Sequence, residues 1–100
     1  SDLTSIVRKV SGIDALVDRV TDNLPSLEQV WVCGDLAKGL PSHYIETILV
    51  GADLDERYIK VLTDKAQSLT GKTITVKAEE EIVLNGVKDG LLVWQKEDEK

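Results

Sequence analysis

Two short apolar runs that end at glycine constrain the fold of this 100-residue chain more than any other feature. The first run covers residues 30–33 and stops at Gly34, and the second covers residues 45–50 and stops at Gly51. Both are rich in β-branched residues, which favours buried strands over helices. Because functional groups commonly lie on loops held by a rigid sheet, we expect any site at the connection between these strands.

Amphipathic spacing predicts a helix before the first strand. Apolar residues recur at helical spacing over residues 12–23, and acidic residues occupy the other face. We expect a cap near Ser11, and Pro25 closes the helix. Residues 2–10 are predicted as a short helix or an irregular lead-in.

A second helix is predicted after the second strand, ending near Leu69 and stopped by Gly71. Asp53 or Asp55 is expected to cap its start, and capping is favoured over a metal site built from these two carboxylates. Its predicted apolar face consists of Leu54, Tyr58, Val61, Leu62, Ala66 and Leu69.

The last third of the chain predicts two further strands. Residues 73–77 alternate cleanly between polar and apolar side chains, and residues 91–94 are apolar. Between them, residues 79–83 are predicted as a short helix that begins with glutamates, or residues 82–84 as a strand with a turn at 85–86. The fold class expected is α/β (α+β), a small sheet with helices packed on it.

Composition restricts the partners and the compartment. The chain has 12 basic and 18 acidic residues and a net charge of −6, with no Lys/Arg cluster, so we expect no direct contact with nucleic acid. The single cysteine, Cys33, is predicted as a small core residue in a reducing cytoplasm. No signal peptide or apolar run of membrane length is present in the sequence.

The sequence GDLAKG at residues 34–39, a short polar loop and a strand of pattern x-h-E-x-h-h-V-G resemble the nucleotidyltransferase fold of the DNA polymerase beta superfamily. The closer resemblance is to the minimal nucleotidyltransferase-like domain that follows the winged helix in some ArsR-type transcription regulators. Residues 2–24 are similar to the linker and first helix that join the two domains in those regulators. The resemblance implies a mixed β-sheet flanked by helices, and one domain spanning residues 1–100. Residues 1–11 would lead in from a missing N-terminal winged helix, and residues 96–100 would form a frayed tail.

Active members of that family place a Gly-Ser turn beside acidic residues that alternate on the next strand. Glycine lets the backbone approach the triphosphate, and the carboxylates hold two Mg²⁺ ions. When this motif is aligned with the chain, Gly34 matches its glycine, whereas Asp35 stands at the position of its serine. Lys38 and Gly39 keep the basic residue and the second glycine of the turn.

The strand positions depart further from the pattern. Tyr44 stands at the first carboxylate position, and only Glu46 at the second is acidic. Residues 73–77, which should supply the third carboxylate, contain none. One carboxylate of three does not hold two Mg²⁺ ions, so the resemblance predicts no metal, no cofactor and no catalysis. The predicted relic of a nucleotide or anion site comprises Gly34, Asp35, Lys38, Gly39, Tyr44 and Glu46.

These observations favour a non-catalytic regulatory or interaction domain of a bacterial transcription regulator. Its expected partners are a second copy of the chain, another protein, or a small anionic ligand. The alternative is an active small nucleotidyltransferase of the antitoxin kind, which would use Mg²⁺ and a nucleoside triphosphate. A third possibility is a generic interaction domain whose resemblance to the family is accidental.

Overall fold

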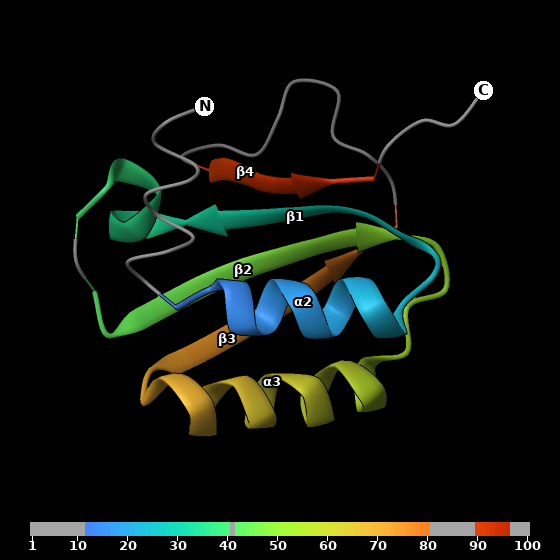
Figure 1. Cartoon of the computed structure of the whole chain (residues 1–100). Helices are drawn as coiled ribbons and strands as arrows, with labels where there is room; N and C mark the ends of the chain where they lie inside the picture. Colours follow the sequence, from blue (N-terminus) through green and yellow to red (C-terminus); the bar gives the residue numbers. More distant parts are fainter. Residues whose placement is uncertain (1–11, 41, 81–89, 97–100) are drawn as a thin grey trace.

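The computed structural model describes residues 12–40, 42–80 and 90–96 (Figure 1). The elements are α2 (Asp14–Asn23), β1 (Leu27–Cys33), the 3₁₀ helix η1 (Gly34–Lys38), β2 (Tyr44–Gly51), α3 (Glu56–Thr70), β3 (Thr73–Glu79) and β4 (Gly90–Gln95). The four strands form one sheet in the order β3-β2-β1-β4. Strand β1 is antiparallel to β2 and β4, whereas β2 and β3 are parallel. The predicted mixed sheet flanked by helices is confirmed.

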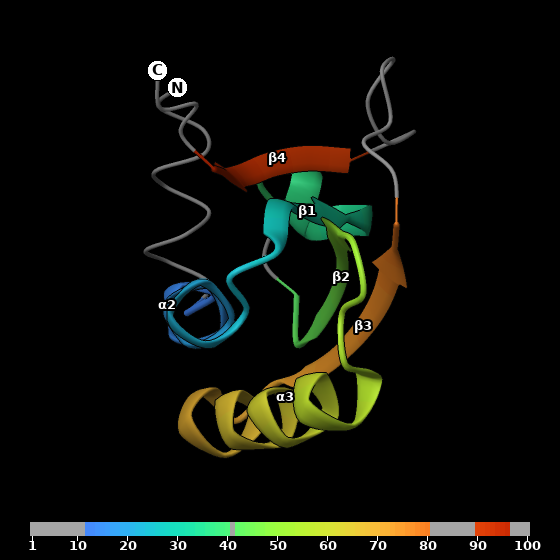
Figure 2. The ribbon, with the colours of Figure 1, turned by 90° about the vertical axis from the view of Figure 1, so that its right-hand side faces the viewer.

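Both helices cover the same face of the sheet, as the end-on view in Figure 2 shows. The core lies between them and the inward side chains of the strands. Its fully buried members include Ile13, Leu16, Val17, Val20, Leu27, Val30, Val32, Ile45 and Leu49. The aliphatic runs that predicted the strands therefore supply the centre of the core.

Helix α2 and strand β1 differ from their predicted bounds. The residue that caps α2 is Ile13, which has no side-chain capping bond, and the predicted cap at Ser11 lies outside the described residues. Strand β1 extends back to Leu27 and so includes the polar residues Glu28 and Gln29. The buried Gln29 accepts a hydrogen bond from Trp31 Nε1 at 2.9 Å, so the amide can lie inside a strand.

The predicted apolar face of α3 is wrong at three positions. Tyr58, Val61 and Leu69 are 38%, 61% and 58% exposed. The residues that α3 buries are Ile59, Leu62, Thr63 and Ala66. Thr63 can face inward because its hydroxyl donates to Ile59 O at 2.7 Å, and this internal bond is not visible from residue type.

The N-terminus of α3 is capped by Asp55, as predicted. Its carboxylate accepts hydrogen bonds from the backbone N–H groups of Arg57 at 3.0 Å and Tyr58 at 3.3 Å. Substitution of Asp55 by Ala is expected to lower the free energy of unfolding by about 1 kcal/mol, because two helix N–H groups lose their acceptor. Urea unfolding followed by circular dichroism measures the change. Asp18→Ala, an exposed Asp within α2, is the control, and equal losses in both variants would contradict the capping role.

The C-terminal half of the sheet confirms two predictions and corrects one. Gly71 ends α3 in the left-handed conformation, with φ of 70°, and β4 includes the predicted strand 91–94. Glu79 does not begin a helix, because it is the last residue of β3 and pairs with Val50. The remaining predictions concern residues 1–11, 81–89 and 97–100, which lie outside the part of the chain that the structure describes. Within the described part of the chain, no helix has the length and apolarity that a membrane crossing requires.

Candidate functional site

The connection from β1 begins with the short 3₁₀ helix η1, which forms the glycine-bounded turn predicted at residues 34–39. Gly34 starts the turn with φ of 77°, a conformation that glycine adopts without strain. Leu36 is buried and anchors the turn to the core. Gly39, with φ of 81°, ends the turn, and its N–H donates to Leu36 O at 3.0 Å. Both predicted glycines therefore serve the geometry of this turn.

The carboxylate of Glu46 lies directly against this turn. A methyl group at the Cβ position of Gly34 would stand 2.9 Å from Glu46 Oε2, closer than van der Waals contact allows. Glu46 reaches this place because β1 and β2 pair Cys33 with Glu46, which brings the end of β1 beside the start of β2. The structure thus joins two predicted site residues, Gly34 and Glu46, that are distant in sequence.

Glu46 projects from the face of the sheet that the helices leave uncovered. Its neighbours Ile45 and Thr47 are buried on the helix side, and strand alternation directs Glu46 to the opposite face. The parallel register places Thr75 of β3 beside it. A cavity of about 320 Å³ opens here, lined by Cys33, Glu46, Thr47, Ile48, Thr75, Val76 and Lys77.

The other predicted residues surround this pair. Tyr44 lies on the same face of β2 as Glu46 and is 59% exposed, and its N–H donates to Ser42 Oγ at 3.0 Å. Asp35 and Lys38 are exposed on η1. A negative and a positive side chain therefore flank the Gly34 turn on the solvent side.

Sequence reasoning missed three residues that line the cavity. Cys33 was expected in the core, but it is half-buried and lines the open cavity beside Glu46. Thr75 and Lys77 were noted only for lacking a carboxylate, although alternation places them on one face. Thr75 and Lys77 lie beside Glu46 because β3 pairs in parallel with β2. The sequence does not reveal that pairing.

The described residues do not fit a two-metal centre. No group of three or more His, Cys, Asp or Glu side chains within the described ranges is arranged to hold a metal ion. Glu46 is the one carboxylate that lines the cavity on the open face. A pair of Mg²⁺ ions needs several shared oxygen ligands, so this donor set is too small for it.

Comparison with known proteins identifies the architecture. No family model matches the chain, and no curated protein matches it. Among solved structures, a chain from a mutant of the toxin–antitoxin complex MntA–HpeT superposes with a TM-score of 0.64 at 19% identity, covering 83% of this chain and 73% of that one. The chain has the nucleotidyltransferase-like fold.

Two further structures agree with this fold. One is a complex of a tri-AMPylated HEPN toxin with an MNT antitoxin from Shewanella oneidensis, with a TM-score of 0.61, 16% identity and coverage of 94% and 73%. The other is a candidate nucleotidyltransferase from Sulfolobus solfataricus, with a TM-score of 0.57, 20% identity and coverage of 96% and 89%. At such identities the likeness concerns the nucleotidyltransferase-like fold itself.

These neighbours contradict the expectation that the domain is not an enzyme. They are a candidate nucleotidyltransferase and toxin–antitoxin complexes, one of which contains an AMPylated toxin. The expectation rested mainly on Asp35 and Tyr44 at two motif positions, and on the lack of a carboxylate in residues 73–77. It gave too little weight to the scaffold, in which Glu46 still meets the Gly34 turn.

Proposed function

We propose that this chain is a nucleotidyltransferase of the antitoxin kind, which transfers a nucleoside monophosphate from a nucleoside triphosphate to a hydroxyl group of a partner protein. The observation that carries the proposal is the contact between the Glu46 carboxylate and the Gly34 turn on the open face of the sheet. The nucleotidyltransferase-like fold of the toxin–antitoxin neighbours supports the same assignment.

The residues around Glu46 suit this chemistry. Lys38 on the turn and Lys77 in the cavity supply positive charge for the triphosphate, and the glycine turn lets its backbone approach the phosphates. The acceptor hydroxyl forms a bond to the α-phosphorus, the bond to the β-phosphate oxygen breaks, and pyrophosphate leaves. The Glu46 carboxylate accepts the hydroxyl proton. Because the described donors do not fit a two-metal centre, no step is assigned to a metal ion.

Glu46→Gln is expected to lower nucleotidyl transfer at least about a hundredfold, because an amide does not accept the proton. The assay combines the purified chain with Mg²⁺, α-phosphate-labelled ATP and, as candidate acceptor, a HEPN toxin of the kind bound by a structural neighbour. It measures both label on protein and released pyrophosphate. Titration with AMP-PNP measures nucleotide binding separately from transfer.

The matched control is Asp22→Asn, which makes the corresponding carboxylate-to-amide change at an exposed residue on α2. This variant should retain full transfer. Failure of the parent chain to bind AMP-PNP and to label any protein overturns the proposal. Equal rates of transfer by the parent chain and by Glu46→Gln would show that Glu46 does not act in the reaction.

The wider setting is inferred from the resemblance and the antitoxin neighbours. A partner protein belongs to the proposal as the acceptor, and a cytoplasmic location fits an enzyme that consumes a nucleoside triphosphate. Membership of a larger ArsR-type regulator with an upstream winged helix, and formation of a homodimer, stay predictions.

A further inference from the structure

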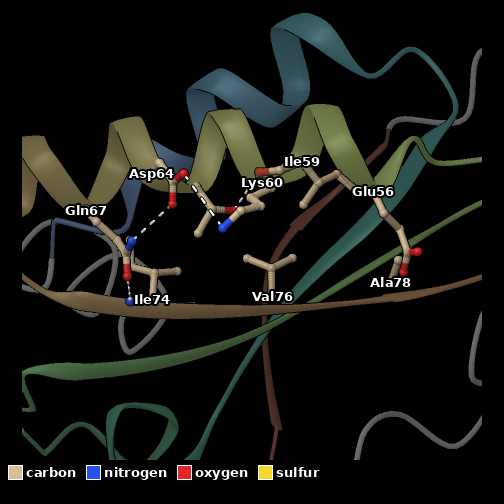
Figure 3. Close-up of a pocket in the computed structure, with 9 residues that line it drawn as sticks. Glu56, Ile59, Lys60, Asp64, Gln67, Ile74, Val76 and Ala78 are labelled. Atoms are coloured by element: carbon tan, nitrogen blue, oxygen red, sulfur yellow. Dashed lines mark hydrogen bonds and ion pairs between the residues drawn. The ribbon is translucent and has the colours of Figure 1, made fainter.

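A groove runs between α3 and the edge strand β3, on the helix-covered side of the sheet (Figure 3). Its volume is about 350 Å³. The apolar residues that line it are Ile59, Ile74, Val76 and Ala78, and the polar residues are Glu56, Lys60, Thr63, Asp64 and Gln67. Glu46 projects from the opposite face of the sheet, and Val76 is the one described residue that lines both this groove and the cavity beside Glu46.

Alternate backbone groups of β3 point away from β2, toward the outer edge of the sheet that the described strands form. In a parallel pair, the N–H and C=O groups of every second residue face the same neighbour. Thr73 N–H donates to His43 O at 2.9 Å, so the odd-numbered residues of β3 face β2. The backbone groups of Ile74, Val76 and Ala78 consequently face away from β2.

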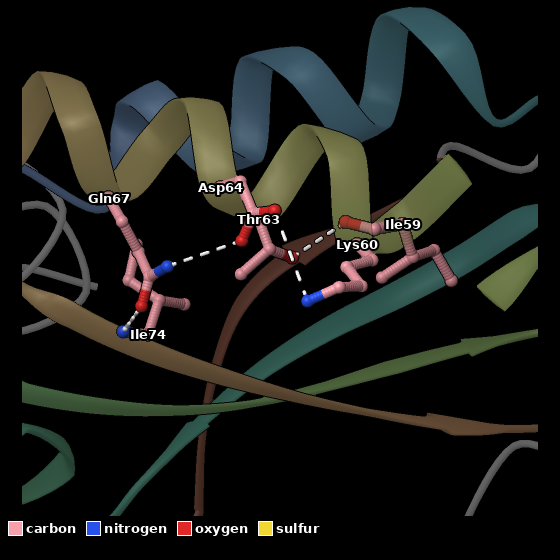
Figure 4. A network of polar contacts seen from close by, with 6 residues as sticks. All are labelled: Ile59, Lys60, Thr63, Asp64, Gln67 and Ile74. Carbon is pink, nitrogen blue, oxygen red and sulfur yellow. Dashed lines mark hydrogen bonds and ion pairs between the residues drawn. The ribbon is translucent and has the colours of Figure 1, made fainter. Parts of the chain in front are cut away.

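One end of this edge is already closed by a side chain (Figure 4). Gln67 Oε1 accepts a hydrogen bond from Ile74 N–H at 2.8 Å, and Gln67 Nε2 donates to Asp64 Oδ1 at 3.4 Å. The stretch of edge from Val76 to Ala78 has no such cap within the described part of the chain. It is therefore the stretch where another strand can pair.

We propose that an extended segment of a partner protein adds to β3 as a further strand and inserts its apolar side chains beneath α3. An edge strand beside a helix gives main-chain hydrogen bonds for affinity and a groove for alternate side chains. Here Val76 and Ala78 supply the backbone groups, and Ile59 and Ile74 help to form the apolar floor. The proposal does not depend on nucleotide transfer.

The charge of the groove defines the chemistry of the partner. At the Glu79 end, the groove continues into a second hollow lined by Asp53, Glu56, Glu79 and Glu80, together with Gly51, Leu54 and Ala78. Lys77 pairs with Glu79 at 3.5 Å and offsets that one charge, and the carboxylates of Asp53, Glu56 and Glu80 keep this end acidic. A partner segment that alternates apolar and polar residues and carries Lys or Arg over this end complements the surface.

Selection from a random peptide library displayed on phage, with the purified chain as bait, tests this proposal. The enriched peptides should share alternating apolar residues and a basic residue. A synthetic copy of the best peptide, labelled with fluorescein, then reports binding by anisotropy. Hydrogen exchange measured by NMR should show new protection at the amides of Val76 and Ala78, because the added strand bonds to them.

Two variants separate strand addition from other binding modes. Val76→Pro removes an outward N–H without touching the bonds to β2, and Glu56→Lys with Glu79→Lys reverses the acidic end. Each is expected to weaken peptide binding at least about tenfold. The control, Asp18→Lys with Asp22→Lys, reverses two exposed charges on α2 and should leave binding unchanged.

Three results overturn the proposal. They are an absence of enriched peptides, protection of amides elsewhere than β3, and binding that survives both variants. Self-association of the chain through β3, measured by sedimentation, would instead assign this edge to a second copy.

Discussion

Replacement of Leu49 by Ala is expected to lower the free energy of unfolding by about 2–5 kcal/mol, the usual cost of truncating a fully buried leucine. Leu49 has no exposed surface and lies in the interior strand β2, paired with Val30 of β1 and Ala78 of β3. The helices cover this face of the sheet, so the cavity left by the lost atoms has little room to collapse.

The matched control for Leu49 is Ile48→Ala, which removes an aliphatic side chain of similar size from the adjacent position. Ile48 lies on the uncovered face and is only half-buried, so a smaller loss is expected. Urea unfolding at equilibrium, followed by tryptophan fluorescence, measures both variants. An equal or larger loss for Ile48→Ala would show that the core does not lie beneath the helices.

Gly51→Ala is expected to destabilise the chain by about 1–3 kcal/mol through overpacking. A Cβ at Gly51 would lie 2.6 Å from the backbone oxygen of Ser26 and 3.1 Å from Leu27 Cα. Backbone atoms cannot rotate away as a side chain does, so the start of β1 has to move. The pairing of Leu27 with Gly51 holds this part of the sheet, and the displacement weakens it.

Gly71→Ala separates this steric effect from the conformational preference of glycine. Gly71 has φ of 70°, but no neighbouring atom lies within 4 Å of a Cβ built there. Its substitution is expected to cost only about 1 kcal/mol, from the left-handed conformation alone. Thermal unfolding of both variants gives the comparison, and a Gly71→Ala loss that exceeds that of Gly51→Ala would contradict the close approach.

Local patterns in the sequence determined where most elements lie. Alternation and β-branched runs located the strands, because a side chain on a strand faces one of two sides. Asp55 and Gly71 marked the ends of α3, because capping depends on residues next to one another in the chain. The glycine-bounded connection at Gly34 was also visible, since the turn requires a residue that tolerates positive φ.

Tertiary structure decided which of these pieces meet. The buried face of α3 is not the face with the most apolar residues. Thr63 can be buried because its hydroxyl donates a hydrogen bond to Ile59 O within the helix, whereas Val61 faces solvent. The contact of Glu46 with Gly34 depends on the register of β1 and β2, and the place of Lys77 depends on the parallel pairing of β2 and β3. Register is fixed by the packing of many residues distant in sequence, so neither contact is written in the local pattern of the chain.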